Sequence, residues 1–123
     1  MNKYVNWIIV IIYMGLIYYL SSLSNPLEQV IPKRAFFYFN FKYFIYHIIE
    51  YVILSLFLYR ALLNYKNPKT LAILIATLYA ITDEIHQYFV PGRISSVFDI
   101  AIDFFGAVAM QCIINIYDWI KEK

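Results

Sequence analysis

The sequence predicts an all-α fold: a polytopic membrane protein in which a four-transmembrane-helix bundle holds a polar pocket in one leaflet. Of its 123 residues, 63% are hydrophobic and only 15% are charged, and the mean hydropathy is +0.62. A soluble domain is usually less apolar and about a quarter charged. The chain also divides into four apolar blocks, each close to the roughly 20 residues that a helix needs to cross a membrane. These two observations indicate that the bilayer is the solvent.

The predicted spans form a single domain over residues 1–123 and cover residues 4–23, 43–63, 70–89 and 96–116. Turn-forming residues separate the blocks. Pro26 follows the first block, Pro68 precedes the third, and Pro91 with Gly92 precedes the fourth. An even number of spans returns the C-terminus to the side of the N-terminus.

The first block also has features of a secretory signal peptide, because Lys3 precedes the apolar stretch and Ser21, Ser22 and Ser24 follow it. Its apolar run is longer than a usual signal core of about 7 to 15 residues, and the serines lack the alanine-type cleavage pattern. We therefore expect this block to be a spanning helix.

Basic residues predict the orientation of the bundle and exclude one class of partner. Six lie on the side of the termini and four on the other side, which favours cytoplasmic termini and an extracytoplasmic pocket in the cell membrane. The first six are Lys3, Arg60, Lys66, Lys69, Lys121 and Lys123, and the other four are Lys33, Arg34, Lys42 and Arg93. A net charge of +2 without a dense basic run argues against a nucleic-acid partner. The single cysteine, Cys112, is expected to be a packed small side chain.

Ionisable residues inside the spans locate the candidate site. A charge at mid-bilayer costs about 2.5 to 3.5 kcal/mol, so such groups are kept where they pair inside the bundle or face water. Five of the eight acidic residues and both histidines lie in these segments, near the same end of the bundle: His47, Glu50, Asp83, Glu84, His86, Asp99 and Asp103. The opposite halves of the helices, such as residues 53–58, 71–78 and 107–110, are nearly pure hydrocarbon. The pattern predicts one polar pocket.

The second span carries His47, Glu50 and Tyr51 at positions i, i+3 and i+4, so all three are expected on one helical face. A carboxylate beside an imidazole can orient it, raise its basicity or share a metal with it. The alternative is a buried hydrogen bond that joins two helices.

The third span ends with a denser group. Asp83, His86 and Gln87 share one face, and Glu84 is turned about 100° from Asp83. Glu84 is therefore expected to face a different neighbour or to reach water at the rim. The alternative for the whole group is a solvated helix end.

Arg93 follows the predicted turn and is suited to bidentate binding of a phosphate or carboxylate. Alternatively, it neutralises Asp99 or Asp83 within the protein. Asp99 and Asp103 are one helical turn apart, and two nearby carboxylates need a cation or a shared proton. Gly106, a further turn along, is expected to allow close helix approach.

A divalent cation is one candidate cofactor, with ligands from Asp83, His86, Asp99 and Asp103, although no ligand spacing here is diagnostic. Ser21 or Ser22 could supply a nucleophile if a histidine from another helix acts as base. The alternative role for these serines is to cap or solvate the end of the first helix.

Taken together, these motifs resemble those of the VanZ-like family of small bacterial membrane proteins. The matching elements are Ser21-Ser22, His47-x-x-Glu50-Tyr51, Asp83-Glu84-x-His86-Gln87-x-Phe89-x-Pro91-Gly92-Arg93, and Asp99 with Asp103 and Gly106. The family often has Gln after the paired serines, where this chain has Leu23. The resemblance implies a polytopic protein of the cell envelope and, in some relatives, reduced sensitivity to the glycopeptide antibiotic teicoplanin. It does not imply a settled reaction.

The leading expectation is recognition of, or hydrolysis or group transfer on, a membrane lipid or a lipid-linked envelope precursor. The candidate catalytic residues are His47, Glu50, Asp83, Glu84, His86, Asp99 and Asp103, and the candidate substrate-binding residues are Arg93, Gln87, Tyr51, Ser21 and Ser22. One rival is a proton-coupled transporter or flippase, which would need polar residues continuing into the other leaflet. Another is a structural or accessory protein, in which the polar groups only join the helices.

Overall fold

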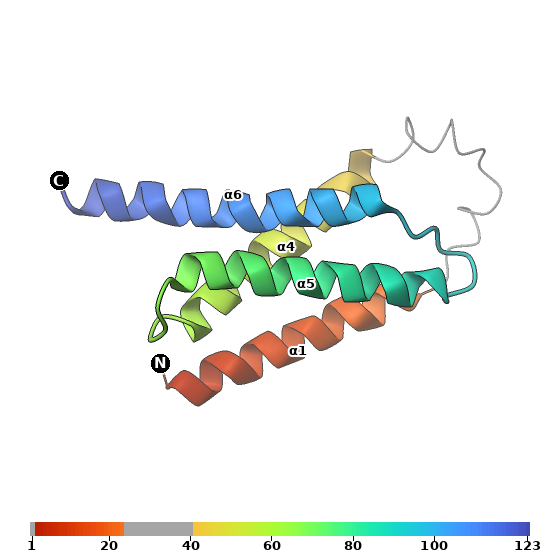
Figure 1. Cartoon of the computed structure of the whole chain (residues 1–123), viewed down its shortest axis with the longest axis horizontal. Coiled ribbons are helices and arrows are strands. Elements are labelled where there is room, and N and C mark those ends of the chain that lie inside the picture. The colour runs from red at the N-terminus through yellow and green to blue at the C-terminus, as the bar shows by residue number, and fades with distance from the viewer. Residues whose placement is uncertain (1, 24–40) are drawn as a thin grey trace.

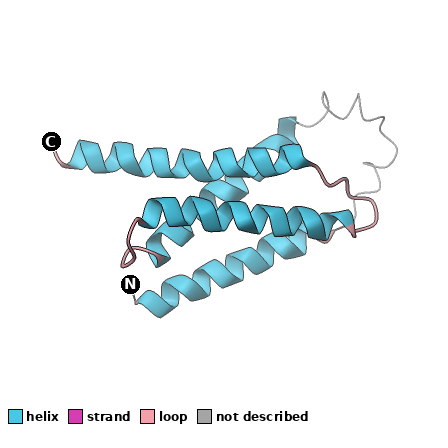
Figure 2. Cartoon of the chain, viewed as in Figure 1, coloured by secondary structure: helices cyan, strands magenta, loops and turns pink. Residues whose placement is uncertain are grey.

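The computed structural model describes residues 2–23 and 41–123, which fold into four α-helices and no strand (Figures 1 and 2). The helices are α1 (Lys3–Ser21), α4 (Phe41–Ala61), α5 (Pro68–Tyr88) and α6 (Val97–Lys121). The predicted all-α, four-helix fold is confirmed. The predicted blocks differ from the helices by at most two residues, except that α6 continues five residues past residue 116. This extension contains the charged residues Asp118 and Lys121, so hydropathy marks where the uncharged apolar run ends rather than where the helix ends.

Local sequence explains where the helices begin and how α5 is joined to α6. Asn2 and Ser96 are N-caps, whose side chains accept hydrogen bonds from the backbone N–H two residues later, and Pro68 is the first residue of α5. Beyond α5, the N–H of Arg93 donates to Val90 O at 3.2 Å, and Gly92 has φ 84°. Proline followed by a glycine with positive φ is typical of a type II turn, so the predicted turn at Pro91-Gly92 is confirmed.

The helices lie side by side, and both chain termini are at the same end of the bundle (Figure 1). The helix α4 contacts each of the other three helices, and α6 packs on α4 and α5. The ends of α1 and α5 and the starts of α4 and α6 therefore meet at the end of the bundle away from the termini. This topology was expected from four antiparallel blocks.

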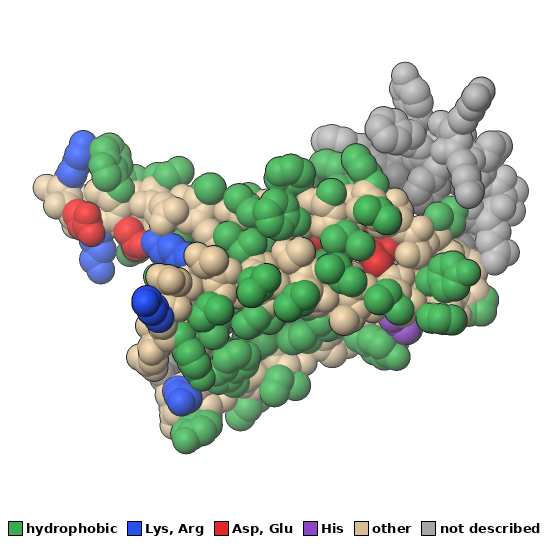
Figure 3. All heavy atoms as spheres, viewed as in Figure 1, with side chains coloured by type: hydrophobic (Ala, Val, Ile, Leu, Met, Phe, Trp, Pro, Cys, Tyr) green, Lys and Arg blue, Asp and Glu red, His purple; other side chains and the backbone are tan. Residues whose placement is uncertain are grey.

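Of the described helices, α1, α4 and α6 are long and apolar enough to cross a membrane. Figure 3 shows hydrophobic side chains over much of the helical surface, whereas lysine and arginine side chains gather near the end that carries the termini. These features make the chain a multi-pass membrane protein. The helix α5 has 21 residues but a lower mean hydropathy, because its last turns contain Asp83, Glu84 and His86. That α5 also crosses the membrane stays a prediction.

The prediction that Cys112 is packed is wrong, because its side chain is exposed on the surface of α6. In a membrane helix, both the core-facing and the lipid-facing positions are apolar. An apolar neighbourhood in the sequence therefore does not show which of the two a small residue occupies.

Small residues bring the helices close together in the core. Ala72, Ala76 and Ala80 form a fully buried stripe along α5, and small side chains at such positions allow backbones to approach closely. At Gly106 of α6, an added Cβ would lie 2.8 Å from the backbone oxygen of Ile48 in α4. The expected close approach at Gly106 is therefore confirmed.

The halves of the helices near the termini contain a buried polar pair that the sequence analysis did not expect. The Ser55 hydroxyl donates to Ala107 O at 3.0 Å, and Gln111 Nε2 donates to the Ser55 hydroxyl at 2.7 Å. Both side chains are buried between α4 and α6. The description of residues 53–58 and 107–110 as nearly pure hydrocarbon gave no sign of this pair, because one serine barely lowers the local hydropathy and Gln111 lies just beyond the second range.

We predict that Gly106→Ala destabilises the protein and that Gly15→Ala does not. The new methyl at position 106 meets backbone atoms that cannot rotate away, and overpacking of this kind costs about 1 to 3 kcal/mol. A Cβ at Gly15 meets nothing within 4 Å. Thermal unfolding in the same detergent tests the pair. Equal melting temperatures for the two variants would contradict the close contact of α4 with α6.

Candidate functional site

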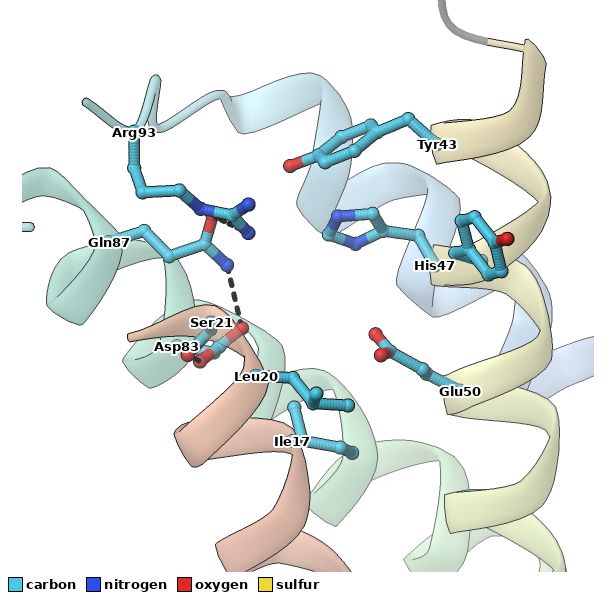
Figure 4. Close-up of a pocket in the computed structure, with 10 residues that line it drawn as sticks. Ile17, Leu20, Ser21, Tyr43, His47, Glu50, Asp83, Gln87 and Arg93 are labelled. Atoms are coloured by element: carbon cyan, nitrogen blue, oxygen red, sulfur yellow. Dashed lines mark hydrogen bonds between the residues drawn. The ribbon is translucent and has the colours of Figure 1, made fainter. Parts of the chain in front are cut away.

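A pocket lies at the end of the bundle away from the termini, among α1, α4, α5 and the turn that follows α5 (Figure 4). Its volume is about 310 Å³. The lining combines apolar, aromatic and polar side chains from four segments of the chain: Ile17, Leu20, Ser21, Tyr43, Tyr46, His47, Glu50, Asp83, Gln87 and Arg93. Six of these residues were candidate site residues in the sequence: Ser21, His47, Glu50, Asp83, Gln87 and Arg93.

Asp83 is the centre of a hydrogen-bond chain that connects α1, α5 and the turn. The Ser21 hydroxyl donates to its Oδ1 at 2.6 Å, and Gln87 Nε2 donates to its Oδ2 at 2.8 Å. Arg93 Nη2 in turn donates to Gln87 Oε1 at 3.2 Å. Each oxygen of the buried Asp83 carboxylate therefore has a donor, and Gln87 fixes the position of the Arg93 guanidinium.

His47 and Asp103 form the polar connection between α4 and α6. His47 Nδ1 donates to Asp103 Oδ1 at 2.9 Å, and both side chains are buried. Because Nδ1 is bonded to Asp103, Nε2 is the ring nitrogen available for proton transfer. The described residues give Nε2 no hydrogen-bond partner. A carboxylate that orients an imidazole in this way is the usual support of a general base.

Tyr43 in α4 and Asp99 in α6 lie next to this pair, one turn closer to the start of each helix. The Tyr43 ring is 4.4 Å from the His47 ring between centroids, and its hydroxyl is 3.5 Å from Asp99 Oδ2. The Arg93 guanidinium lies over the same tyrosine ring at 5.8 Å. Tyr43 thus touches the imidazole and the guanidinium at once, although the sequence analysis did not include it in the site.

Glu50 and Tyr51 differ in their surroundings despite being neighbours in α4. The Glu50 carboxylate points into the pocket across from Arg93 (Figure 4). Within the described chain, no hydrogen bond or ion pair is formed by that carboxylate. Tyr51 is fully buried against Gly106 and does not line the pocket. The structure therefore does not place the expected substrate-binding side chain of Tyr51 at the pocket.

His86 and Ser22 lie at the contact between α1 and α5 and are not among the residues that line the pocket. His86 Nδ1 is 3.3 Å from the Ser21 hydroxyl, and its Nε2 is 3.4 Å from the Ser22 hydroxyl. Its ring stacks on Tyr18 at 4.1 Å between centroids. Neither His86 nor Ser22 lines the pocket, and the Ser22 hydroxyl donates to Tyr18 O at 2.7 Å, as in a helix end.

Glu84 faces away from the pocket, toward the start of α6. Its Oε2 accepts a hydrogen bond from the backbone N–H of Ser96 at 2.8 Å, and the side chain lines a separate, mostly apolar pocket of about 330 Å³. The expectation that Glu84 and Asp83 meet different neighbours is thus met. Glu84 lies near the N-terminus of α6, where a carboxylate is favourable.

The residues expected to hold a divalent cation are divided between two hydrogen-bonded groups. Asp83 and His86 bond to serines of α1, whereas Asp103 and Asp99 contact His47 and Tyr43 of α4. Among the described residues, no three His, Cys, Asp or Glu side chains gather in a way that could hold a metal ion. Among the described side chains, Arg93 is a candidate group for anion binding and His47 is a candidate group for proton transfer.

Four lining residues were missed in the sequence analysis: Ile17, Leu20, Tyr43 and Tyr46. Helical spacing holds part of the signal, since Tyr43, His47 and Glu50 follow one another at intervals of four and three residues along one face of α4. Aromatic residues are also common at helix ends in membrane proteins, so this spacing alone did not separate Tyr43 from an interfacial anchor.

Comparison with known proteins agrees with this architecture. The family model of VanZ/LLP1 matches residues 5–118 and thus nearly the whole chain. No curated protein and no solved structure matches the chain. The matched range contains all the pocket residues. It also contains the four helices, except for the first residues of α1 and the last residues of α6. The chain belongs to the VanZ/LLP1 family.

Proposed function

We propose that this VanZ/LLP1 family protein binds the polar headgroup of a bacterial envelope lipid or lipid-linked precursor in the pocket at the end of the bundle. The observation that supports this most directly is the lining of the pocket. Arg93, His47 and Glu50 surround a small cavity whose other walls include Ile17 and Leu20. A site with both charged and apolar walls suits an amphiphile, which has a polar headgroup and apolar tails.

The depth of the pocket supports a headgroup as the occupant. His47 lies six residues inside α4 and Asp83 five residues from the end of α5, which at 1.5 Å per residue is about 8 to 9 Å below the helix ends. The headgroup regions add about 5 to 8 Å to each side of a hydrocarbon core of roughly 30 Å. The pocket is thus near the boundary between headgroups and acyl chains.

Arg93 is the natural anion-binding group of this pocket. Its guanidinium is positioned by Gln87 and by the Tyr43 ring, and guanidinium binds phosphate with two parallel hydrogen bonds. The same guanidinium lines the pocket, where a ligand can reach it. This favours recognition of a phosphate over simple neutralisation of Asp83, whose oxygens already have donors in Ser21 and Gln87.

The His47–Asp103 pair favours chemistry on the bound headgroup as a second step. His47 Nε2 would take a proton from water as the water oxygen attacks the phosphorus or carbonyl carbon of the headgroup. The leaving oxygen would then receive that proton as its bond breaks. In group transfer, an acceptor hydroxyl replaces the water. Altered sensitivity to glycopeptides such as teicoplanin would be a cellular consequence of changed envelope lipids.

We propose that the termini are cytoplasmic and that the pocket opens toward the extracytoplasmic leaflet. In a Cys112→Ala background, Ser95→Cys should react with a membrane-impermeant maleimide on intact cells, whereas Lys66→Cys should react only after the cells are opened. Both positions are exposed and lie at opposite ends of the bundle. Labelling of Lys66→Cys on intact cells, with Ser95→Cys protected, would invert the orientation.

We predict that Arg93→Gln lowers the affinity for phospholipid by about tenfold or more, because a hydrogen bond to a charged group is worth about 1.5 to 3 kcal/mol. Arg93→Lys should be impaired to a smaller degree, since it keeps the charge but not the bidentate geometry. The measurement is native mass spectrometry with short-chain phosphatidylglycerol and phosphatidylethanolamine, with diacylglycerol as the ligand that lacks a phosphate.

The control variant is Arg60→Gln, which removes an arginine that is exposed at the opposite end of the bundle. It should bind both phospholipids as the unsubstituted protein does. Binding of Arg93→Gln at the unsubstituted level, with melting temperatures unchanged, would remove Arg93 from the site.

A further inference from the structure

We infer that the headgroup taken by this pocket is zwitterionic and carries a primary ammonium as well as a phosphate, with Glu50 receiving the ammonium while Arg93 holds the phosphate. This inference rests on the proposed function, that the pocket binds a lipid headgroup. It names the chemical class of that headgroup as an aminophospholipid.

Glu50 is the lining carboxylate to which the described residues give no hydrogen bond or salt bridge. The other lining carboxylate, Asp83, accepts hydrogen bonds from Ser21 and Gln87 on its two oxygens. In the described part of the chain, the Glu50 carboxylate accepts none, although the residue is half-buried and lines the pocket. A carboxylate near hydrocarbon depth is retained where it pairs or faces water. A ligand ammonium would supply the missing donor.

The geometry separates the two charges in the way that such a ligand requires. Arg93 comes from the turn after α5, and Glu50 comes from α4 on the opposite side of the pocket, with open space between the two side chains (Figure 4). A phosphoethanolamine group likewise has its phosphate and its ammonium at two ends of a short chain. Apolar side chains of Ile17 and Leu20 form the wall below this space in the view of Figure 4.

Charge and size both argue against a purely anionic headgroup or a large one. The lining contains two carboxylates and one guanidinium, and the lining imidazole of His47 is bonded to a further carboxylate, Asp103. An anion held by Arg93 would therefore have Glu50 as an unfavourable neighbour, whereas an ammonium on the same ligand would reverse the sign of that interaction. A volume of about 310 Å³ is at the small end of ligand pockets, which suits one small headgroup rather than a glycan.

The test measures the preference for a free amine in the headgroup. Native mass spectrometry of the detergent-extracted full chain would compare short-chain phosphatidylethanolamine, its N-acetyl derivative and phosphatidylglycerol. We expect the unsubstituted protein to bind phosphatidylethanolamine at least fivefold more tightly than either lipid without an amine. Glu50→Gln should abolish that preference and leave phosphatidylglycerol binding equal or stronger. Glu50→Asp should keep part of it.

Glu122→Gln is the matched control, since it removes the same charge from an exposed residue beyond the end of α6 and should keep the full preference. Equal binding of the amine and non-amine lipids by the unsubstituted protein would overturn the inference and leave headgroup binding intact. Binding of none of the three lipids would overturn both the proposed function and the inference. Tight binding of free phosphoethanolamine, without acyl chains, would support the ammonium and phosphate pairing but contradict a lipid as its source.

Discussion

A buried carboxylate in an apolar bundle needs a donor from another helix, and the hydrogen bond of Asp103 in α6 to His47 in α4 meets this need near the end of the bundle that holds the pocket. It forms beside a close approach of the two helices, because Gly106 lies one turn further along α6 and leaves no side chain between its backbone and that of Ile48. The same contact buries Tyr51 and directs His47 toward the pocket. Helix packing and site geometry are therefore consequences of one interface.

The remaining polar groups follow the same rule on the other helices. Along α5, the buried alanine stripe ends at Ala80, and the next buried positions on that helix are Asp83, Glu84 and Gln87. Asp83 is bonded to α1 through Ser21, whereas Glu84 is bonded to the start of α6 through Ser96. The adjacent acidic residues Asp83 and Glu84 of α5 thus bond to two different neighbours, α1 and the start of α6. The Arg93 guanidinium and the Glu50 carboxylate both line the pocket, and these two groups support the proposal of a zwitterionic headgroup.

Much of the fold could be predicted from the sequence, because hydropathy and proline positions mark four blocks. The gathering of Ser21, His47, Asp83 and Arg93 at one end also follows, since antiparallel helices bring those ends together. The neighbours of each side chain could not be predicted. Helical spacing shows that Glu84 is turned from Asp83, but not that it meets Ser96. Hydropathy could not separate the exposed Cys112 from a packed one, nor reveal that Ser55 and Gln111 bond inside apolar segments, because lipid and protein core select the same residues.

The interaction between His47 and Asp103 is measured most directly by a double-mutant cycle with His47→Gln, Asp103→Asn and the double variant, using the free energy of unfolding in one detergent. If the two side chains are hydrogen-bonded between α4 and α6, the second substitution costs little once the first has been made. A coupling energy of about 0.5 to 2 kcal/mol is then expected. Additive losses, with a coupling energy within about 0.3 kcal/mol of zero, would contradict the bond on which this account of the fold and the pocket depends.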